Sequence, residues 1–282
     1  MHKLMVSLPV LVFTACVVDE QGPEADEDLT QEEARTAVLE VQESSAGDVA
    51  TIEVIDVSTD FTIGGQIFDA LNSIADFWES QADCTTVSME GDVITVDFGS
   101  LDDGCEYRGH TWAGLDTITI LGVVEGNLRV EHEFTQFTNG NVTLDGTATV
   151  TWSSSEDTRH VVTDYTLANF VTDTIVEVRG DHTTGRLDPD RPIRESGFTL
   201  DGSKEWTGEN GLWMTELNDI EWRIDDPAPQ AGAARVTSAG GKTLTIRYDR
   251  IDGNTTSARV TGPNGNEFLF RITADGTVVD DE

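Results

Sequence analysis

Cys84 and Cys105 are the residues of this sequence whose type and spacing most directly predict a chemical bond. Apart from Cys16, they are the only cysteines in the chain. An oxidising compartment joins such a pair as a disulfide, which stabilises the fold by about 3 kcal/mol for a loop of this size. The alternative is a pair of zinc ligands, but no Cys-x-x-Cys motif or nearby histidine pair completes such a site. We therefore expect a Cys84–Cys105 disulfide.

Catalytic motifs in the sequence are incomplete. The nearest approach to a nucleophile elbow, around Ser238, has valine in place of the first glycine. His132 and Glu133 begin a zinc-protease HExxH motif, but Gln136 replaces its second histidine. The region has a strand pattern, in which positions i and i+4 lie about 13 Å apart, too far to share one metal. We predict no catalytic residues, no metal site and no cofactor, and hence no enzyme.

Histidine, aspartate and tryptophan residues each leave two interpretations open. None of the five histidines has a partner at ligand spacing, which favours surface or satisfied polar residues over bases: His2, His110, His132, His160 and His182. Three short Asp-rich segments, the acidic points, are predicted to be solvated turns, and Ca²⁺-binding loops are the alternative: Asp102-Asp103, Asp188-Pro189-Asp190 and Asp225-Asp226. Four tryptophans are predicted to fill the core or pair across strands; the alternative is that they lie on an exposed sheet face and stack against sugars or apolar ligands: Trp152, Trp206, Trp213 and Trp222.

The chain is strongly acidic, with 53 Asp and Glu against 17 Lys and Arg, for a formal charge of -36. A polyanion of this kind repels the phosphates of nucleic acids and anionic lipid surfaces, so no nucleic-acid partner is expected. The acids are spread along most of the chain, which favours a solvated surface. Recruitment of divalent or organic cations is the alternative.

Residues 1–16 have the pattern of an export signal. Lys3 precedes a mostly apolar stretch that is far shorter than the ~20 residues needed to cross a bilayer. Phe13-Thr14-Ala15-Cys16 resembles the lipobox of bacterial lipoproteins, although Phe13 replaces the usual leucine. We expect a signal peptide at 1–15 and a lipid on Cys16 that anchors the chain in the cell envelope. Val17, not Asp, follows the cysteine, and by resemblance to the lipoprotein sorting rule of two-membrane cells this favours the outer membrane. Plain secretion with a free Cys16 is the alternative.

The acidic residues 16–29 predict a disordered tether that leads into the folded part. Thr30 and Glu33 form a capping box that opens a short helix through Val41. A second helix is predicted at 67–78, where apolar residues recur at steps of three and four.

From Asp92 onward, the period of the apolar residues changes to two, which predicts strands. The expected strands include 93–98, 117–120, 128–134 and 142–144. Eight dipeptides predict tight turns: Asn139-Gly140, Asp145-Gly146, Asp201-Gly202, Asn210-Gly211, Gly240-Gly241, Asp252-Gly253, Asn264-Gly265 and Asp275-Gly276. The fold class is mainly β: a large antiparallel sheet, sandwich or partly closed barrel, preceded by one or two short helices.

Two further sequence features concern the organisation of the β region. Residues 143–147 are echoed at 199–203, which strand patterning alone can produce. Prolines between 225 and 230 predict a break. The β-rich domain therefore spans 30–226, and the strands of 227–282 belong to it or form a small second unit.

The cysteine region carries a family resemblance. Cys84, the strand 94–99, Cys105, the turn 109–114 and the strand 117–120 resemble uncharacterised predicted lipoproteins of myxobacteria and Bacteroidetes. These chains share a cysteine, a strand ending in Phe-Gly, a second cysteine and a Gly-x-Thr-x-x-Gly turn. The resemblance covers roughly residues 60–270 and implies no activity.

Together these features predict a surface-anchored, non-enzymatic lipoprotein that binds an unidentified envelope partner or ligand, or adds to envelope architecture. Its membrane contact is the lipid on Cys16. One alternative is an envelope hydrolase that uses paired carboxylates. A second alternative is a Ca²⁺-dependent adhesive or linker protein.

Overall fold

A computed structural model describes residues 28–59, 84–107, 110–153, 158–191, 193–224 and 226–281. The helix predicted at 67–78 and the signal peptide lie outside these residues. The helices are α1 (Gln31–Thr59) and α3 (Ile193–Ser196), with a 3₁₀ turn η1 (Leu101–Asp103). The first strands are β1 (Thr86–Glu90), β2 (Val93–Asp97), β3 (Cys105–Tyr107), β4 (His110–Val124), β5 (Asn127–Thr138), β6 (Val142–Ser153), β7 (Thr158–Asn169) and β8 (Thr174–Arg186). The others are β9 (Phe198–Gly208), β10 (Gly211–Trp222), β11 (Ala231–Thr237), β12 (Thr243–Arg250), β13 (Thr255–Thr261), β14 (Glu267–Thr273) and β15 (Val278–Asp280).

The start of α1 follows the predicted capping box. Glu33 Oε2 accepts the backbone N–H of Thr30 at 2.9 Å, and Thr30 Oγ1 accepts that of Glu33 at 3.2 Å. Leu29, assigned from the sequence to the disordered tether, is buried instead, and its backbone oxygen accepts a hydrogen bond from Asn266. The folded part therefore begins before Thr30.

The prediction of short helices was wrong in the described part of the chain, because α1 is 29 residues long. Its second half is rich in β-branched residues and contains Ser44, Ser45 and Gly47, all poor helix formers. Contacts with the sheet therefore stabilise this half. Gly47 is required there, since a Cβ would lie 2.6 Å from the hydroxyl of Tyr165.

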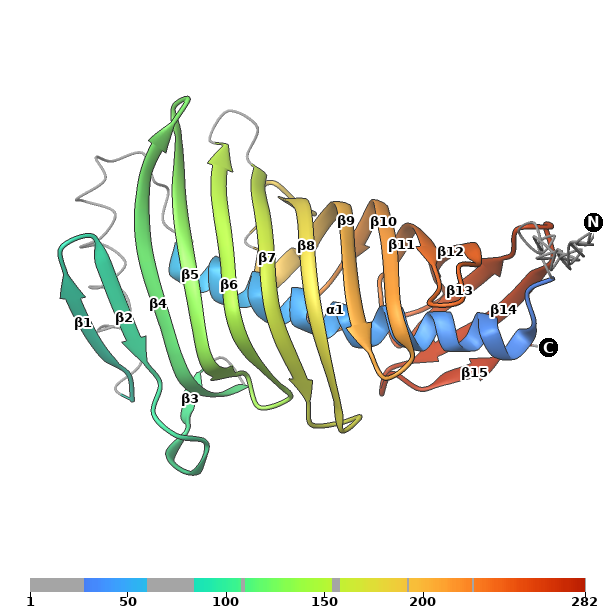
Figure 1. Cartoon of the computed structure of the whole chain (residues 1–282), viewed down its shortest axis with the longest axis horizontal. Helices are drawn as coiled ribbons and strands as arrows, with labels where there is room; N and C mark the ends of the chain where they lie inside the picture. Colours follow the sequence, from blue (N-terminus) through green and yellow to red (C-terminus); the bar gives the residue numbers. More distant parts are fainter. Residues whose placement is uncertain are drawn as a thin grey trace, which may run out of the picture.

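The fifteen described strands form one open antiparallel sheet, which confirms the mainly β class and selects the sheet among the predicted architectures. Neighbours in the sheet follow chain order, except that β3 pairs only with β4. β10 pairs with β11, so the strands after the prolines continue the same sheet. Figure 1 shows α1 along the long axis of the molecule, crossing the strands.

One face of the sheet is buried against α1 and the other is exposed. In β7, alternate residues from Arg159 to Asn169 are buried, while His160, Val162 and Asp164 are exposed. The same alternation continues in β8 and β10. We call these the inner face, toward α1, and the outer face.

Six of the eight predicted glycine turns join strands, and two were wrong. Asp145-Gly146 and Asp201-Gly202 lie inside β6 and β9. Each aspartate accepts a backbone N–H of the neighbouring strand at a β-bulge, from Gln136 at 2.8 Å and from Asp219 at 2.7 Å. Both bulge residues have positive φ, 46° and 49°. At these places Asp-Gly therefore fixes a bulge instead of a turn.

The two bulges are related by an approximate twofold axis that passes through the Thr163–Gly180 pair of β7 and β8. This axis relates β6 to β9, β5 to β10 and β4 to β11. Gly114 of β4 and Gly232 of β11 also correspond, because each has positive φ and a Cβ there would lie 2.1 or 2.2 Å from the bulge backbone oxygen. The echo between 143–147 and 199–203 therefore reflects a real structural correspondence.

Candidate functional site

Cys84 and Cys105 form the expected disulfide, with Cα atoms 5.3 Å apart. The bond ties the chain before β1 to β3. Cys16 lies outside the described residues, so its lipidation remains a prediction. No helix in the described residues is long and apolar enough to cross a membrane.

The four histidines among the described residues occupy separate environments, and His2 lies outside those residues. His132 is fully buried and its Nδ1 lies 3.1 Å from an oxygen of buried Asp116. His182 is also buried, and this burial lowers its pKa. His160 contacts Asp181 on the outer face at 2.7 Å, and His110 contacts Glu53 of α1 at 3.3 Å. No group of three or more metal-ligating side chains occurs among the residues that the structure describes.

The tryptophans belong to the core, as the preferred interpretation expected. Trp206 and Trp213 stack with ring centroids 6.2 Å apart, and both are buried. Trp222 is buried against Phe198, with ring centroids 6.4 Å apart. Trp152 is partly buried beneath the guanidinium of Arg159. These four side chains therefore do not form an exposed stacking platform.

The described residues of the three acidic points lie in an exposed 3₁₀ turn, in a hydrogen-bonded turn and in an ion pair. Asp102 and Asp103 are exposed in η1, and Asp188 accepts the backbone N–H of Asp190 at 3.0 Å. Asp226 is paired with Arg250 at 2.5 Å, and Asp225 lies outside the described residues. Asp188 and Asp226 therefore have local structural roles of the kind expected in and beside turns.

Acidic side chains along α1 bind donors on the strands and hairpin turns of the sheet. Their partners, in chain order, are Glu33 with Lys242 (2.8 Å), Glu40 with Trp206 (3.0 Å), Glu43 with Thr172 (2.8 Å), Asp48 with Lys204 (2.6 Å) and Asp56 with Arg159 (3.2 Å). These acids are therefore not part of a merely solvated surface. They hold the helix against the inner face.

Lys204 and Asp48 form the most buried part of this contact, with side chains only 1% and 3% exposed. Lys204 Nζ also lies 2.8 Å from Ser45 Oγ, and Tyr165 donates to Asp48 at 3.2 Å. Burial lowers the pKa of Lys204, and Asp48 opposes this shift. Burial, followed by the charge of Asp48, raises the pKa of Tyr165 well above its ordinary value.

A serine beside a lysine is an arrangement that some enzymes use for nucleophilic catalysis. Here Ser45 and Lys204 are both buried between helix and sheet, and the lysine is already paired with Asp48. A substrate would have to displace α1 to reach the hydroxyl. We therefore assign this cluster to helix attachment.

The strand pattern contains a signal for this cluster that the sequence-based predictions missed. Lys204 occupies the buried phase of β9, between Leu200 and Trp206, where alternation calls for an apolar residue. Arg159 and His132 do the same in β7 and β5. A charged residue in the apolar phase of a strand predicts a buried partner, because an unpaired buried charge is costly.

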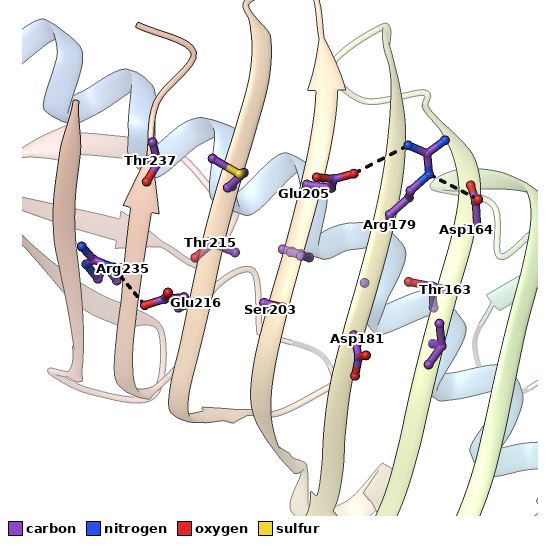
Figure 2. A pocket seen from close by; sticks show the side chains of 14 residues that line it. Thr163, Asp164, Arg179, Asp181, Ser203, Glu205, Thr215, Glu216, Arg235 and Thr237 are labelled. Atoms are coloured by element: carbon purple, nitrogen blue, oxygen red, sulfur yellow. Dashed lines mark hydrogen bonds and ion pairs between the residues drawn. The ribbon is translucent and has the colours of Figure 1, made fainter. Parts of the chain in front are cut away.

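The outer face carries the candidate functional site, a hollow of about 490 Å³ over β7–β11. Figure 2 shows its labelled side chains on adjacent strands, with Arg179 reaching both Asp164 and Glu205. Small residues, Gly180 and Ser203, lie in the hollow. Val162 and Met214 add exposed apolar surface.

Charges of both signs, joined as ion pairs between neighbouring strands, line the hollow. Arg179 lies 3.3 Å from Asp164 and 3.6 Å from Glu205, and Arg235 lies 3.2 Å from Glu216. These side chains are 43% to 68% exposed, so their ion pairs contribute little to stability and remain open to a partner. The hollow therefore has the chemistry of a polar binding surface.

The fold defines a class of mainly β protein in which a sheet that meanders in chain order holds one long helix on its inner face. Comparisons with protein-family models, curated proteins and solved structures found no match to this chain. The resemblance to envelope lipoproteins thus stays a prediction.

Proposed function

We propose that this protein is a non-enzymatic binding module, anchored at the outer membrane by lipid on Cys16, that binds an envelope partner through the outer face of β7–β11. The observation that carries this proposal is the exposed hollow with ion-paired charges of both signs, on a sheet whose opposite face packs against α1. A large exposed face opposite a rigid core offers a preformed surface for a partner.

The chemistry of the hollow favours binding over the hydrolase alternative. Its carboxylates Asp164, Glu205 and Glu216 are exposed and paired with arginines. Exposed pairs of this kind provide specificity through charge complementarity. The Ca²⁺-dependent alternative has less support, because Asp188 already accepts a backbone hydrogen bond and Asp226 is already paired with Arg250.

Anchoring is tested by replacing Cys16→Ser and fractionating cells. We expect the wild-type chain in the membrane fraction and the variant in the soluble envelope fraction, because the acyl chains supply the membrane affinity. Mass analysis of the mature N-terminal peptide should show an acylated cysteine. Unchanged partitioning of the variant would contradict the anchor.

Binding is tested with the mature Cys16→Ser chain and isolated envelopes of the native host, by saturable cosedimentation. Arg179→Ala with Glu205→Ala should weaken binding about tenfold or more, because two central charged contacts are removed at constant net charge. The matched control is Arg191→Ala with Glu195→Ala, an exposed ion pair at 3.5 Å outside the hollow. Equal binding by both double variants would refute the proposed surface.

A further inference from the structure

A second hollow runs beside α1, on the side where the hairpin tips approach the helix. Its volume is about 590 Å³. One wall is the helix face from Thr36 to Ala46, and the other consists of the β7–β8 and β9–β10 tips with the start of β6. The turn between β14 and β15 also contributes to the lining. We call this the helix-side groove; it shares no lining residue with the outer-face hollow.

The helix-side groove exposes large apolar side chains. Leu39 is 47% exposed, Ile175 65% and Val171 79%. They come from α1 and from the β7–β8 hairpin. Apolar side chains exposed together around a hollow are typical of a surface that a partner covers.

Every ionisable side chain that lines the helix-side groove is acidic. The lining contains Glu40, Glu43, Glu209 and Asp275, and no lysine, arginine or histidine. Hydrogen bonds from Thr273 and Thr277 lower the pKa of Asp275, so this carboxyl stays ionised at neutral pH. The groove therefore combines an apolar wall with negative charge of a single sign.

The two walls are already held together. Glu40 accepts hydrogen bonds from Trp206 and, at 2.6 Å, from Asn210 of the β9–β10 tip. Glu43 accepts from the hydroxyls of Thr172 and Thr174 at the β7–β8 tip. A groove that is preformed in this way requires little ordering when a ligand binds.

We propose that the helix-side groove binds a cationic, partly apolar peptide segment of a partner protein. Apolar side chains of that segment contact Leu39 and Ile175, and its lysine or arginine side chains approach the acidic lining. The single sign of the lining charge selects a cation, and the exposed leucine and isoleucine exclude a small hydrated ion as the ligand. This site lies apart from the outer face, so either proposal can fail alone.

The dimensions of the groove suit a short extended peptide. The helix wall spans about 15 Å, from ten residues at about 1.5 Å each. An extended strand of four or five residues, at about 3.3 Å each, covers the same length. A segment of this size presents two side chains to the helix wall and two or three outward.

The test uses the mature chain and three short fluorescent peptides in which leucine alternates with lysine, serine or glutamate. Fluorescence anisotropy is measured in about 0.1 M and about 0.5 M NaCl, because the higher salt suppresses nonspecific attraction to a polyanion. We expect saturable binding of the lysine peptide that persists at the higher salt. The serine peptide should bind more weakly, and the glutamate peptide should not bind.

Groove variants locate the binding. Leu39→Ser with Ile175→Ser should weaken the lysine peptide about tenfold or more, as expected from the loss of two apolar contacts. Val123→Ser with Ile251→Ser is the matched control, since both side chains are exposed outside the groove. Glu209→Gln, at an exposed position, should weaken binding of the lysine peptide but not of the serine peptide. This variant tests the charge of the groove without replacing an apolar side chain.

Hydrogen exchange supplies an independent readout. The lysine peptide should slow exchange in residues 36–46 and 169–176. Binding that disappears at the higher salt, that is equally weakened by the control pair, or that leaves these segments unprotected would overturn the proposal. Equal affinity for the serine peptide would also overturn it, because the charge of the groove would then play no part.

Discussion

At the scale of single residues, the structure places several polar atoms where their cost or benefit can be measured. The phenol of Tyr248 in β12 is buried on the inner face, and its hydroxyl has no hydrogen-bond partner among the described residues. Burial also raises the pKa of Tyr248. This side chain therefore adds apolar contact at the expense of an unsatisfied hydroxyl.

Tyr248→Phe should leave the free energy of unfolding unchanged or raise it by about 1 kcal/mol at neutral pH, because an unsatisfied buried hydroxyl is removed. The folded-state pKa lies above the unfolded-state value of about 10, so the unfolded chain loses this proton first. Stability therefore falls as pH rises above about 10, by about 1.4 kcal/mol per pH unit for each such tyrosine. Urea unfolding between neutral pH and about pH 11 should show a shallower fall in the variant. A loss of stability at neutral pH would reveal a partner for the hydroxyl.

The Lys204–Asp48 pair should behave as a unit. Lys204→Met leaves the Asp48 carboxylate buried with Tyr165 and Ser45 nearby, and should lower the free energy of unfolding by about 3–5 kcal/mol. Adding Asp48→Leu should recover part of this loss, because no uncompensated charge remains. Urea unfolding of both single variants and the double variant measures the coupling.

A matched control for this cycle is Arg235→Met on the outer face. Its ion pair with Glu216 is exposed, so its loss should cost less than about 1 kcal/mol. Additive effects of the Lys204 and Asp48 replacements would contradict the assigned role of the pair.

At the scale of elements, the two related bulges, between β5 and β6 and between β9 and β10, each depend on a glycine. Gly146 and Gly202 both have φ of 142°, and a Cβ at either position would lie 2.3 Å from a backbone oxygen of the next strand. No side chain is tolerated at such a distance without a shift of the strand. The sheet therefore needs glycine at both places.

Gly202→Ala should lower the free energy of unfolding by about 3 kcal/mol, from backbone strain together with the steric contact. Gly146→Ala should have a similar effect, since the two sites correspond. Gly253→Ala is the control, because nothing lies within 4 Å of the position that its new methyl group would take. Thermal or urea unfolding measures all three. A mild effect at Gly202 alone would break the correspondence between the bulges.

At the scale of the whole molecule, the excess of acids sets the response to salt. The carboxylates that bind the inner face are partly removed from solvent, whereas most others are exposed. Screening therefore acts mainly on repulsion between surface charges. Asp188 and Asp226 are engaged in local contacts, a backbone hydrogen bond and an ion pair.

NaCl should raise the melting temperature, and CaCl₂ at equal ionic strength should add little. A bound Ca²⁺ would instead produce a saturating shift by mass action, about 2.7 kcal/mol at a hundredfold excess over Kd. Differential scanning calorimetry at matched ionic strength separates these outcomes. A saturable Ca²⁺ shift that is lost on Asp225→Asn with Asp226→Asn would favour the calcium-dependent alternative.

The predictions from sequence that the structure confirms depend on local chemistry or on composition. Alternation predicted the strands, glycine dipeptides predicted six hairpin turns, and Thr30 with Glu33 predicted the start of α1. Elimination among three cysteines predicted the disulfide. These features depend on residues close in the chain or on composition, which a single sequence contains.

Tertiary contacts decided the rest. Asp145 and Asp201 support bulges because a neighbouring strand presents a backbone N–H at the right place, and a turn dipeptide alone does not contain that information. The length of α1 depends on donors such as Lys204, which is 156 positions from Asp48. The outer-face hollow and the helix-side groove likewise arise between strands and hairpin tips brought together by register. Such sites have no local sequence signature, because their energies come from contacts that exist only after the sheet has formed around the helix.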